Sequence, residues 1–137
     1  MITKKHKEIV TGGDTGFTLI ELVVVIAIIA IIGAIAITIL IRSRRMAEEI
    51  TAKHDLNNFV QIQNTYNLEH GSFKGTAGDV VSGDASVPST LALEGFTPSP
   101  QVVVTINSVD PLLVVSATHR NTNTVWQYRQ DTGQITK

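Results

Sequence analysis

The feature that most constrains this 137-residue chain is one long apolar segment near its N-terminus. Residues 22–41 form an uninterrupted run of twenty without a charged side chain, and only Gly33 and Thr38 depart from its large or small apolar composition. As an α-helix that rises about 1.5 Å per residue, this run would cross the roughly 30 Å hydrocarbon core of a bilayer. A buried core helix of so small a protein would keep a polar face. The sequence therefore predicts a membrane-spanning helix.

A secretory signal peptide is the first alternative, because it also places an apolar stretch near the N-terminus. Such a signal needs about 7 to 15 apolar residues and then a cleavage site of the A-x-A type. The present run is longer, and its one match, residues 34–36, lies inside it, so we interpret these small residues as positions for close packing. Three basic residues precede the run and three follow it: Lys4, Lys5, Lys7, Arg42, Arg44 and Arg45. The positive-inside rule therefore leaves the orientation open.

A short polar leader and a specific motif precede the apolar run. Residues 1–16 are polar and too few to fold, and they end in Gly16-Phe17-Thr18-Leu19-Ile20-Glu21. The string Gly-Phe-Thr-Leu-Ile-Glu-Leu, followed by some twenty apolar residues, resembles the class III signal of type IV pilins and type II secretion pseudopilins. That motif is specific because it combines a cleavage site, an acidic residue at a fixed offset and an apolar span. The resemblance covers about residues 1–42.

The resemblance implies a processing and assembly route. A membrane prepilin peptidase would cleave between Gly16 and Phe17 and then N-methylate the new amino group of Phe17. Glycine suits this position, since a residue without a side chain lets a protease approach the extended backbone closely. The further partners implied are an inner-membrane platform protein, an assembly ATPase, membrane lipid before assembly, and other copies of the chain in a homo-oligomeric filament. The chain would lie in the inner membrane as a single-pass protein, and then in a cell-surface pilus or a periplasmic pseudopilus.

Glu21 is an ionisable side chain at the edge of the apolar run. A charge in this setting costs at least a few kcal/mol unless something pairs with it. The resemblance implies that its partner is the positively charged N-terminus of a neighbouring subunit, and that the pair sets the axial stagger of the filament. The alternative is that Glu21 only reaches the lipid headgroups. We therefore treat Glu21 as an assembly residue.

The helix is expected to continue past the apolar run as an amphipathic extension over residues 42–70. No proline occurs before Gly71, which is a typical helix stop, so we predict one helix from Phe17 to about Glu69. Apolar residues recur at three- and four-residue spacing: Met46, Ile50, Leu56, Phe59, Val60, Ile62 and Tyr66. Two pairs at i,i+4 spacing, Arg44 with Glu48 and Arg45 with Glu49, predict weak ion pairs on the helix surface.

Residues 71–137 are expected to form a globular head. The stretch 74–100 is rich in Gly, Ser, Thr, Asp and Pro and is predicted to be a variable loop, with one short turn near Ser89 to Leu93. Antiparallel strands are predicted within residues 102–136, at Val102 to Ile106, Leu112 to Thr118, Thr124 to Arg129 and Gln134 to Thr136. Four side chains are expected to fill the space between helix and sheet: Trp126, Tyr128, Val114 and Val103.

The predicted fold class is α+β and pilin-like. A long N-terminal helix, whose first half spans the membrane, packs against a small C-terminal antiparallel sheet. The four parts of the chain are then the removed leader 1–16, the transmembrane and filament-core helix 17–41, the extension 42–70 and the head 71–137.

Composition narrows the function further. The 11 Lys and Arg nearly balance the 12 Asp and Glu, so no nucleic-acid partner is expected, and no cysteine is present to form a disulfide or a thiolate site. His54, His70 and His119 lack metal-ligand spacing, and we expect solvated or capping roles for them. Asp79, Asp84 and Asp110 lie in predicted loops without the spacing of a calcium loop. We expect no catalytic residue, no cofactor and no bound metal.

The sequence thus favours a structural subunit of a type IV pilus-like filament over an enzyme. A pseudopilin of a type II secretion system is one alternative. A minor pilin for adhesion or DNA uptake is another.

Overall fold

The computed structural model describes residues 16–137, which contain one long helix followed by five strands. The elements are α1 (Leu19–His70), β1 (Val80–Ser82), β2 (Val102–Ser108), β3 (Val114–His119), β4 (Val125–Arg129) and β5 (Gln134–Thr136). Internal contacts divide the chain between Thr38 and Ile39. We call the C-terminal unit, Ile39–Lys137, the head unit. The predicted leader, residues 1–16, lies outside the described residues except for Gly16.

The N-terminal part of α1 has no interior. Every large apolar side chain from Leu19 to Thr38 is at least 44 % exposed. The one hydroxyl in this stretch is satisfied within the helix, because Thr38 Oγ1 donates a hydrogen bond to the carbonyl oxygen of Ala34 at 3.1 Å. A polar group paired in this way adds little to the cost of placing the helix in an apolar environment.

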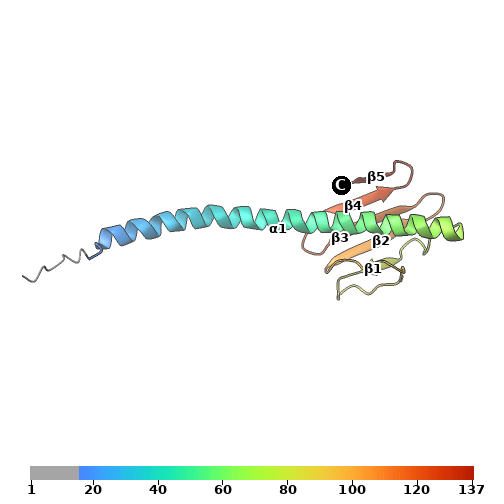
Figure 1. The fold of residues 1–137 in the computed structure, drawn as a ribbon, viewed down its shortest axis with the longest axis horizontal. Coiled ribbons are helices and arrows are strands. Elements are labelled where there is room, and N and C mark those ends of the chain that lie inside the picture. The colour runs from blue at the N-terminus through green and yellow to red at the C-terminus, as the bar shows by residue number, and fades with distance from the viewer. Residues whose placement is uncertain (1–15) are drawn as a thin grey trace, which may run out of the picture. The chain divides into compact units, whose positions relative to one another are not determined.

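In the head unit, one face of α1 packs on the sheet, and Figure 1 shows the five strands beside this part of the helix. Successive buried positions are separated alternately by three residues and by one, which is the spacing of one helix face. They are Ala52, Asp55, Leu56, Phe59, Val60 and Gln63. The ring of Phe59 meets the ring of Phe96 edge to face, with centroids 5.1 Å apart. Met46 and Ile50, predicted for the same face, are 52 % and 64 % exposed and lie outside this core.

The sheet is an antiparallel meander in the order β1-β2-β3-β4-β5. Its buried face alternates with period two along the strands. The side chains that this face buries are Val102, Val104, Ile106, Val115 and Ala117. Trp126 and Tyr128 pack against this core as predicted. The prediction for Val103 and Val114 was wrong by one residue, since both lie on the opposite face of the sheet.

The predicted loop 74–100 contains a strand that the sequence analysis missed. β1 pairs with β2 through Val81 and Val104, and its other edge receives backbone hydrogen bonds from Thr90 and Leu91 to the carbonyl oxygen of Val80. The strand is only three residues long. It exists because β2 supplies a template and because the following loop covers its edge.

The other predicted elements are confirmed with small shifts at their ends. The helix runs from Leu19 to His70 instead of from Phe17 to Glu69. It stops where predicted: Gly71 has a positive φ of 75°, and its N–H donates to the carbonyl oxygen of Asn67 at 2.8 Å. The second predicted strand, expected from Leu112 to Thr118, is β3, which begins two residues later at Val114.

Candidate assembly site

The start of α1 is closed by a reciprocal hydrogen-bonded motif between Thr18 and Glu21. Glu21 Oε2 accepts hydrogen bonds from the backbone N–H of Thr18 at 2.9 Å and from Thr18 Oγ1 at 2.8 Å. In return, the backbone N–H of Glu21 donates to Thr18 Oγ1 at 3.2 Å. This is a capping box, in which the residue before the helix, Thr18, and the third helical residue, Glu21, each accept a hydrogen bond from the backbone N–H of the other. Glu21 therefore has a partner within its own chain.

The sequence analysis missed Thr18, although a signal for it was present. The pattern Thr-x-x-Glu directly before an apolar run is typical of a capping box. Both hydrogen bonds to the carboxylate use Oε2, so within residues 16–137 the oxygen Oε1 accepts no hydrogen bond. The capped state thus orients Glu21 and leaves one of its oxygens able to accept another donor.

The predicted cleavage residues lie before the helix. Gly16 and Phe17 are not helical, and both are exposed, with Phe17 84 % exposed. A Cβ atom added to Gly16 would meet nothing within 4 Å, so the described residues do not shield this position. A bond in non-helical, exposed backbone is one that a protease can bind in extended form.

One face of the first helical turns combines the charge of Glu21 with apolar surface. A shallow hollow of about 350 Å³ is lined there by Phe17, Ile20, Glu21, Val24 and Val25. These residues lie three and four positions apart and therefore share a face of the helix. The arrangement can place an apolar contact and a carboxylate against the same neighbour.

Within the described residues, α1 is the one helix long and apolar enough to cross a membrane. Its most apolar 18-residue window has a mean hydropathy of 3.3, and none of that window is buried. Covering one large apolar side chain is worth about 1.5 to 3 kcal/mol. Covering the whole segment is therefore worth on the order of tens of kcal/mol, a strong drive toward lipid or toward other helices.

The predicted ion pairs of Arg44 with Glu48 and Arg45 with Glu49 are wrong, because the two glutamates contact the β3–β4 connection and the last residue of the chain instead. Glu49 accepts hydrogen bonds from Lys137 Nζ at 2.8 Å and from Thr124 Oγ1 at 2.7 Å. The hydrogen bond from Lys137 lowers the pKa of Glu49 the most, and the bond from Thr124 lowers it further. Glu48 Oε1 accepts a hydrogen bond from the side-chain amide of Asn121 at 3.2 Å. Long-range contacts thus replace the local pairs.

Asp79 and Asp84 accept hydrogen bonds from donors of loop 74–100, and Asp84 also from Arg120 after β3. Asp79 accepts hydrogen bonds from Thr76 and Thr90, and Asp84 accepts them from Ser86 and Arg120. No group of three or more potential metal-ligating side chains occurs in residues 16–137. For Asp110, the third predicted loop aspartate, the structure shows an exposed position.

The three histidines occupy different environments. His70 donates to the carbonyl oxygen of Tyr66 at 3.1 Å and stacks on the Tyr66 ring, which fits the predicted capping role. His54 is exposed, as predicted. His119 departs from the prediction, since it is only 6 % exposed and accepts the backbone N–H of Asn121 at 3.3 Å.

Comparison with known proteins agrees with this arrangement of signal, cap and apolar helix. A family described as the prokaryotic N-terminal methylation motif matches residues 13–37, which include Gly16, Phe17 and Glu21. That motif defines a class of membrane-anchored precursors with a cleavage and methylation signal. The motif is typical of type IV pilins and pseudopilins, and the long helix packed against an antiparallel sheet is a pilin-like α+β arrangement. A comparison with curated proteins finds no match.

The methylation motif indicates how such proteins are processed and where they are located. Proteins with this motif are typically structural subunits that a prepilin peptidase processes and that assemble into filaments. The apolar helix and the motif together fit anchoring in the inner membrane before assembly.

Proposed function

We propose that this protein is a structural subunit of a type IV pilus-like filament. The observation that carries the proposal is the exposed apolar surface of α1 that directly follows the methylation motif. Among the described residues of the N-terminal unit nothing covers residues 19–38, so their burial requires lipid before assembly and other copies of the same helix afterwards. Exchange of one apolar environment for the other lets the helix leave the membrane without exposing its surface to water.

In this proposal, prepilin peptidase cuts between Gly16 and Phe17, removes residues 1–16 and methylates the amino group of Phe17. The exposed, non-helical backbone of these two residues supports the assignment. Residues 17–41 then form the transmembrane and filament-core helix, residues 42–70 the extension, and residues 71–137 the head. An inner-membrane platform protein and an assembly ATPase extract the subunit.

Glu21 acts in assembly by receiving the positively charged N-terminus of a neighbouring copy. The capping box supports this role, because it fixes the carboxylate through Oε2 and leaves Oε1 without a hydrogen bond in the described residues. A charge-assisted bond in an apolar filament core is stronger than the same bond in water. Pairing also removes the cost of burying either charge alone.

Variants at Glu21 and Thr18 test the role of the carboxylate. Glu21→Ala and Glu21→Gln should both be cleaved and methylated normally but should yield few or no filaments. Thr18→Val is the graded comparison: it removes the hydroxyl of the cap at a cost of about 0.5 to 2 kcal/mol to the helix, keeps the charge and the bond from the Thr18 N–H, and should lower filament yield less than Glu21→Ala. Normal filament yield from Glu21→Ala, measured on sheared and pelleted fibres, would remove the pairing role.

The alternatives differ in where the filament is found. A pilus subunit should be abundant in fibres sheared from the cell surface. A pseudopilin of a type II secretion system should be absent from those fibres, and its deletion should block protein secretion. A minor pilin for adhesion or DNA uptake should be present in the fibres only in small amounts, and its deletion should remove binding while fibres persist.

A further inference from the structure

The head unit carries opposite charges at the two ends of its part of α1. Arg42, Arg44 and Arg45 lie at the end nearer the apolar segment, and all three are exposed. Glu69 lies in the last turn of the helix, and Glu94 lies in the loop beside that turn; both are exposed as well. We call the three arginines the basic collar. A filament built from one kind of subunit needs two different surfaces that complement each other, and these two ends meet that condition.

The basic collar lacks acidic partners in the described part of the chain. The nearest glutamates along the helix, Glu48 and Glu49, are held by Asn121, Thr124 and Lys137 of the head. The four ion pairs found in residues 16–137 do not include a collar arginine. Because successive residues are rotated by about 100° around a helix, the three arginines point in three separate directions. Together they present guanidinium groups over somewhat less than half of the helix circumference.

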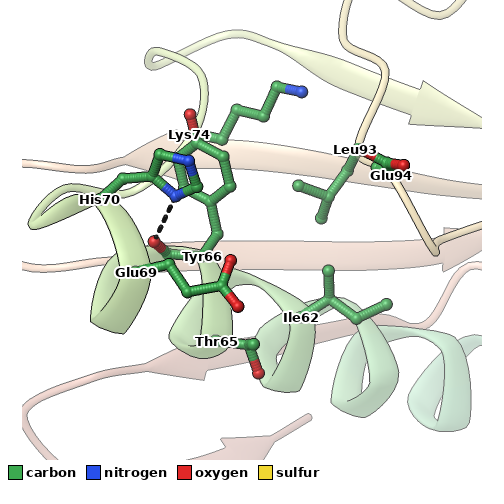
Figure 2. Close-up of a pocket in the computed structure, with 8 residues that line it drawn as sticks. All are labelled: Ile62, Thr65, Tyr66, Glu69, His70, Lys74, Leu93 and Glu94. Atoms are coloured by element: carbon green, nitrogen blue, oxygen red, sulfur yellow. Dashed lines mark hydrogen bonds between the residues drawn. The ribbon is translucent and has the colours of Figure 1, made fainter.

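The acidic end is a formed groove. It has a volume of about 400 Å³ and lies between the last turns of α1 and the loop at Leu93 and Glu94 (Figure 2). The lining combines apolar and aromatic surface from Ile62, Tyr66 and Leu93 with the two carboxylates and the basic side chains of His70 and Lys74. Neither carboxylate forms an ion pair within residues 16–137. We call this site the acidic groove.

The groove is braced from beneath by a buried amide. The side chain of Gln63 is fully buried, and its Nε2 donates to the carbonyl oxygen of Lys74 at 2.7 Å while its Oε1 accepts the Lys74 N–H at 2.9 Å. The Lys74 ammonium lies 5.7 Å from the centre of the Tyr66 ring. A preformed site loses little entropy when it is filled.

We propose that the acidic groove receives the basic collar of a second copy of this chain, and that this contact joins the heads along the filament. The proposal rests on the proposed filament function. Arginine fits the groove in two ways, since its guanidinium can bind a carboxylate through two parallel hydrogen bonds and can pack on an aromatic ring. The 24 residues between Arg45 and Glu69 correspond to roughly 36 Å along α1. Copies in contact are therefore displaced by about that distance along the helix direction.

Cysteine cross-linking tests the contact directly, because the natural chain has no cysteine. Glu94→Cys is combined in turn with Arg42→Cys, Arg44→Cys or Arg45→Cys, and assembled filaments are treated with a short bismaleimide. At least one double variant should give a ladder of covalent multimers on a denaturing gel. Each single variant should stay monomeric, since a head-to-tail contact never brings two copies of one position together. Cross-linked singles, or normal filaments without a ladder in all three doubles, would overturn the proposal.

Charge reversal provides a measurement that does not depend on cysteine geometry. Glu94→Arg should lower filament yield by about tenfold or more, because it places like charges in contact. Asp110→Arg, a matched change at another exposed loop carboxylate, should have little effect. Arg45→Glu combined with Glu94→Arg should recover part of the yield, and raised salt should weaken wild-type filaments more than Glu94→Gln filaments. Equal yields from Glu94→Arg and Asp110→Arg would contradict the contact.

The readouts separate this proposal from the function on which it rests. Intact mass reports the cleavage and methylation of every variant, and wild-type filaments report assembly. An unprocessed or unassembled wild type would reject the filament function itself. If the wild type is processed and forms filaments, and the charge-reversed variants of Glu94 and of the collar arginines do so equally well, only the groove contact is rejected.

Discussion

Two parts of the single helix α1 use apolar side chains in opposite ways. Between Leu19 and Thr38 every large apolar side chain is exposed, whereas between Ala52 and Gln63 one face is buried against the sheet. The first part needs partners outside the chain, and the second part finds them in its own head. The comparison teaches that the apolar side chains of the N-terminal part serve contacts with lipid or with other helices, whereas those of the head part stabilise the fold of the chain itself. The following variants should affect one part and spare the other.

The largest expected effect is the loss of Phe59 from the head core. Phe59 is fully buried and packs on Phe96, so Phe59→Ala should lower the free energy of unfolding by about 3 to 5 kcal/mol. Fluorescence of Trp126, the one tryptophan of the chain, reports the transition in detergent-solubilised protein. Leu68→Ala is the control, because Leu68 is 87 % exposed on the same helix and should change stability by less than about 0.5 kcal/mol. Equal losses for the two variants would show that the head core is misassigned.

A charge in the apolar segment should have the converse effect. Ile32→Asp places a carboxylate near the middle of the span, at a cost of about 2.5 to 3.5 kcal/mol for insertion. Membrane retention and filament yield should fall, while the Trp126 unfolding transition stays at the wild-type position. Ile32→Val should leave all three unchanged. A shifted Trp126 transition in Ile32→Asp would mean that the two parts are not independent.

A smaller effect is expected where a buried carboxylate fixes a loop to the helix. Asp55 Oδ2 accepts the Ser99 N–H at 2.6 Å, and Oδ1 accepts the Ser99 hydroxyl at 3.0 Å. Asp55→Ala should destabilise the head by about 1.5 to 3 kcal/mol, and Ser99→Ala, which removes only the hydroxyl, by about 0.5 to 1.5 kcal/mol. Denaturant titration of both variants checks the order. A larger loss for Ser99→Ala would contradict the assignment of the carboxylate as the anchor.

The smallest effect is a dependence of head stability on pH. Hydrogen bonds from Lys137 and Thr124 lower the pKa of Glu49, and those from Ser86 lower the pKa of Asp84, with a further contribution from Arg120. A carboxylate with a lowered pKa in the folded state stabilises the fold above its unfolded pKa. That stabilisation is lost as the pH falls below about 4 and through the folded pKa.

The Trp126 transition should therefore weaken in acid, and Glu49→Gln should reduce its slope with pH. An unchanged slope in Glu49→Gln would show that the contact of Glu49 with Lys137 contributes nothing to stability.

The sequence predicted most where a residue's role depends on its immediate neighbours. The apolar run, the stop at Gly71 and the strand near Val125 follow from composition and local spacing. The run Val102-Val103-Val104 does not by itself identify the buried face, but Thr105 and Asn107 place the odd-numbered residues on the polar face, so the prediction for Val103 was wrong where the sequence held the signal. A period-two element needs one polar residue to fix the face.

Long-range contacts were beyond local pattern analysis. Glu49 has an arginine four residues earlier, but it contacts Lys137 at the other end of the chain. β1 consists of Val80, Val81 and Ser82 within a turn-rich stretch, and only its pairing with β2 makes it a strand. The acidic groove likewise depends on a loop that returns to the end of α1. Thr18 is different, since the capping-box pattern with Glu21 was visible in the sequence.

The most direct test of the account is the intact mass of the protein purified from its native host. The account predicts a chain that begins at Phe17 and carries one added methyl group on its amino terminus. That result would establish use of the cleavage and methylation signal. An unmodified chain that begins at Met1, or one cut at another position, would contradict the filament-subunit function and leave a membrane protein with an exposed apolar helix of another purpose.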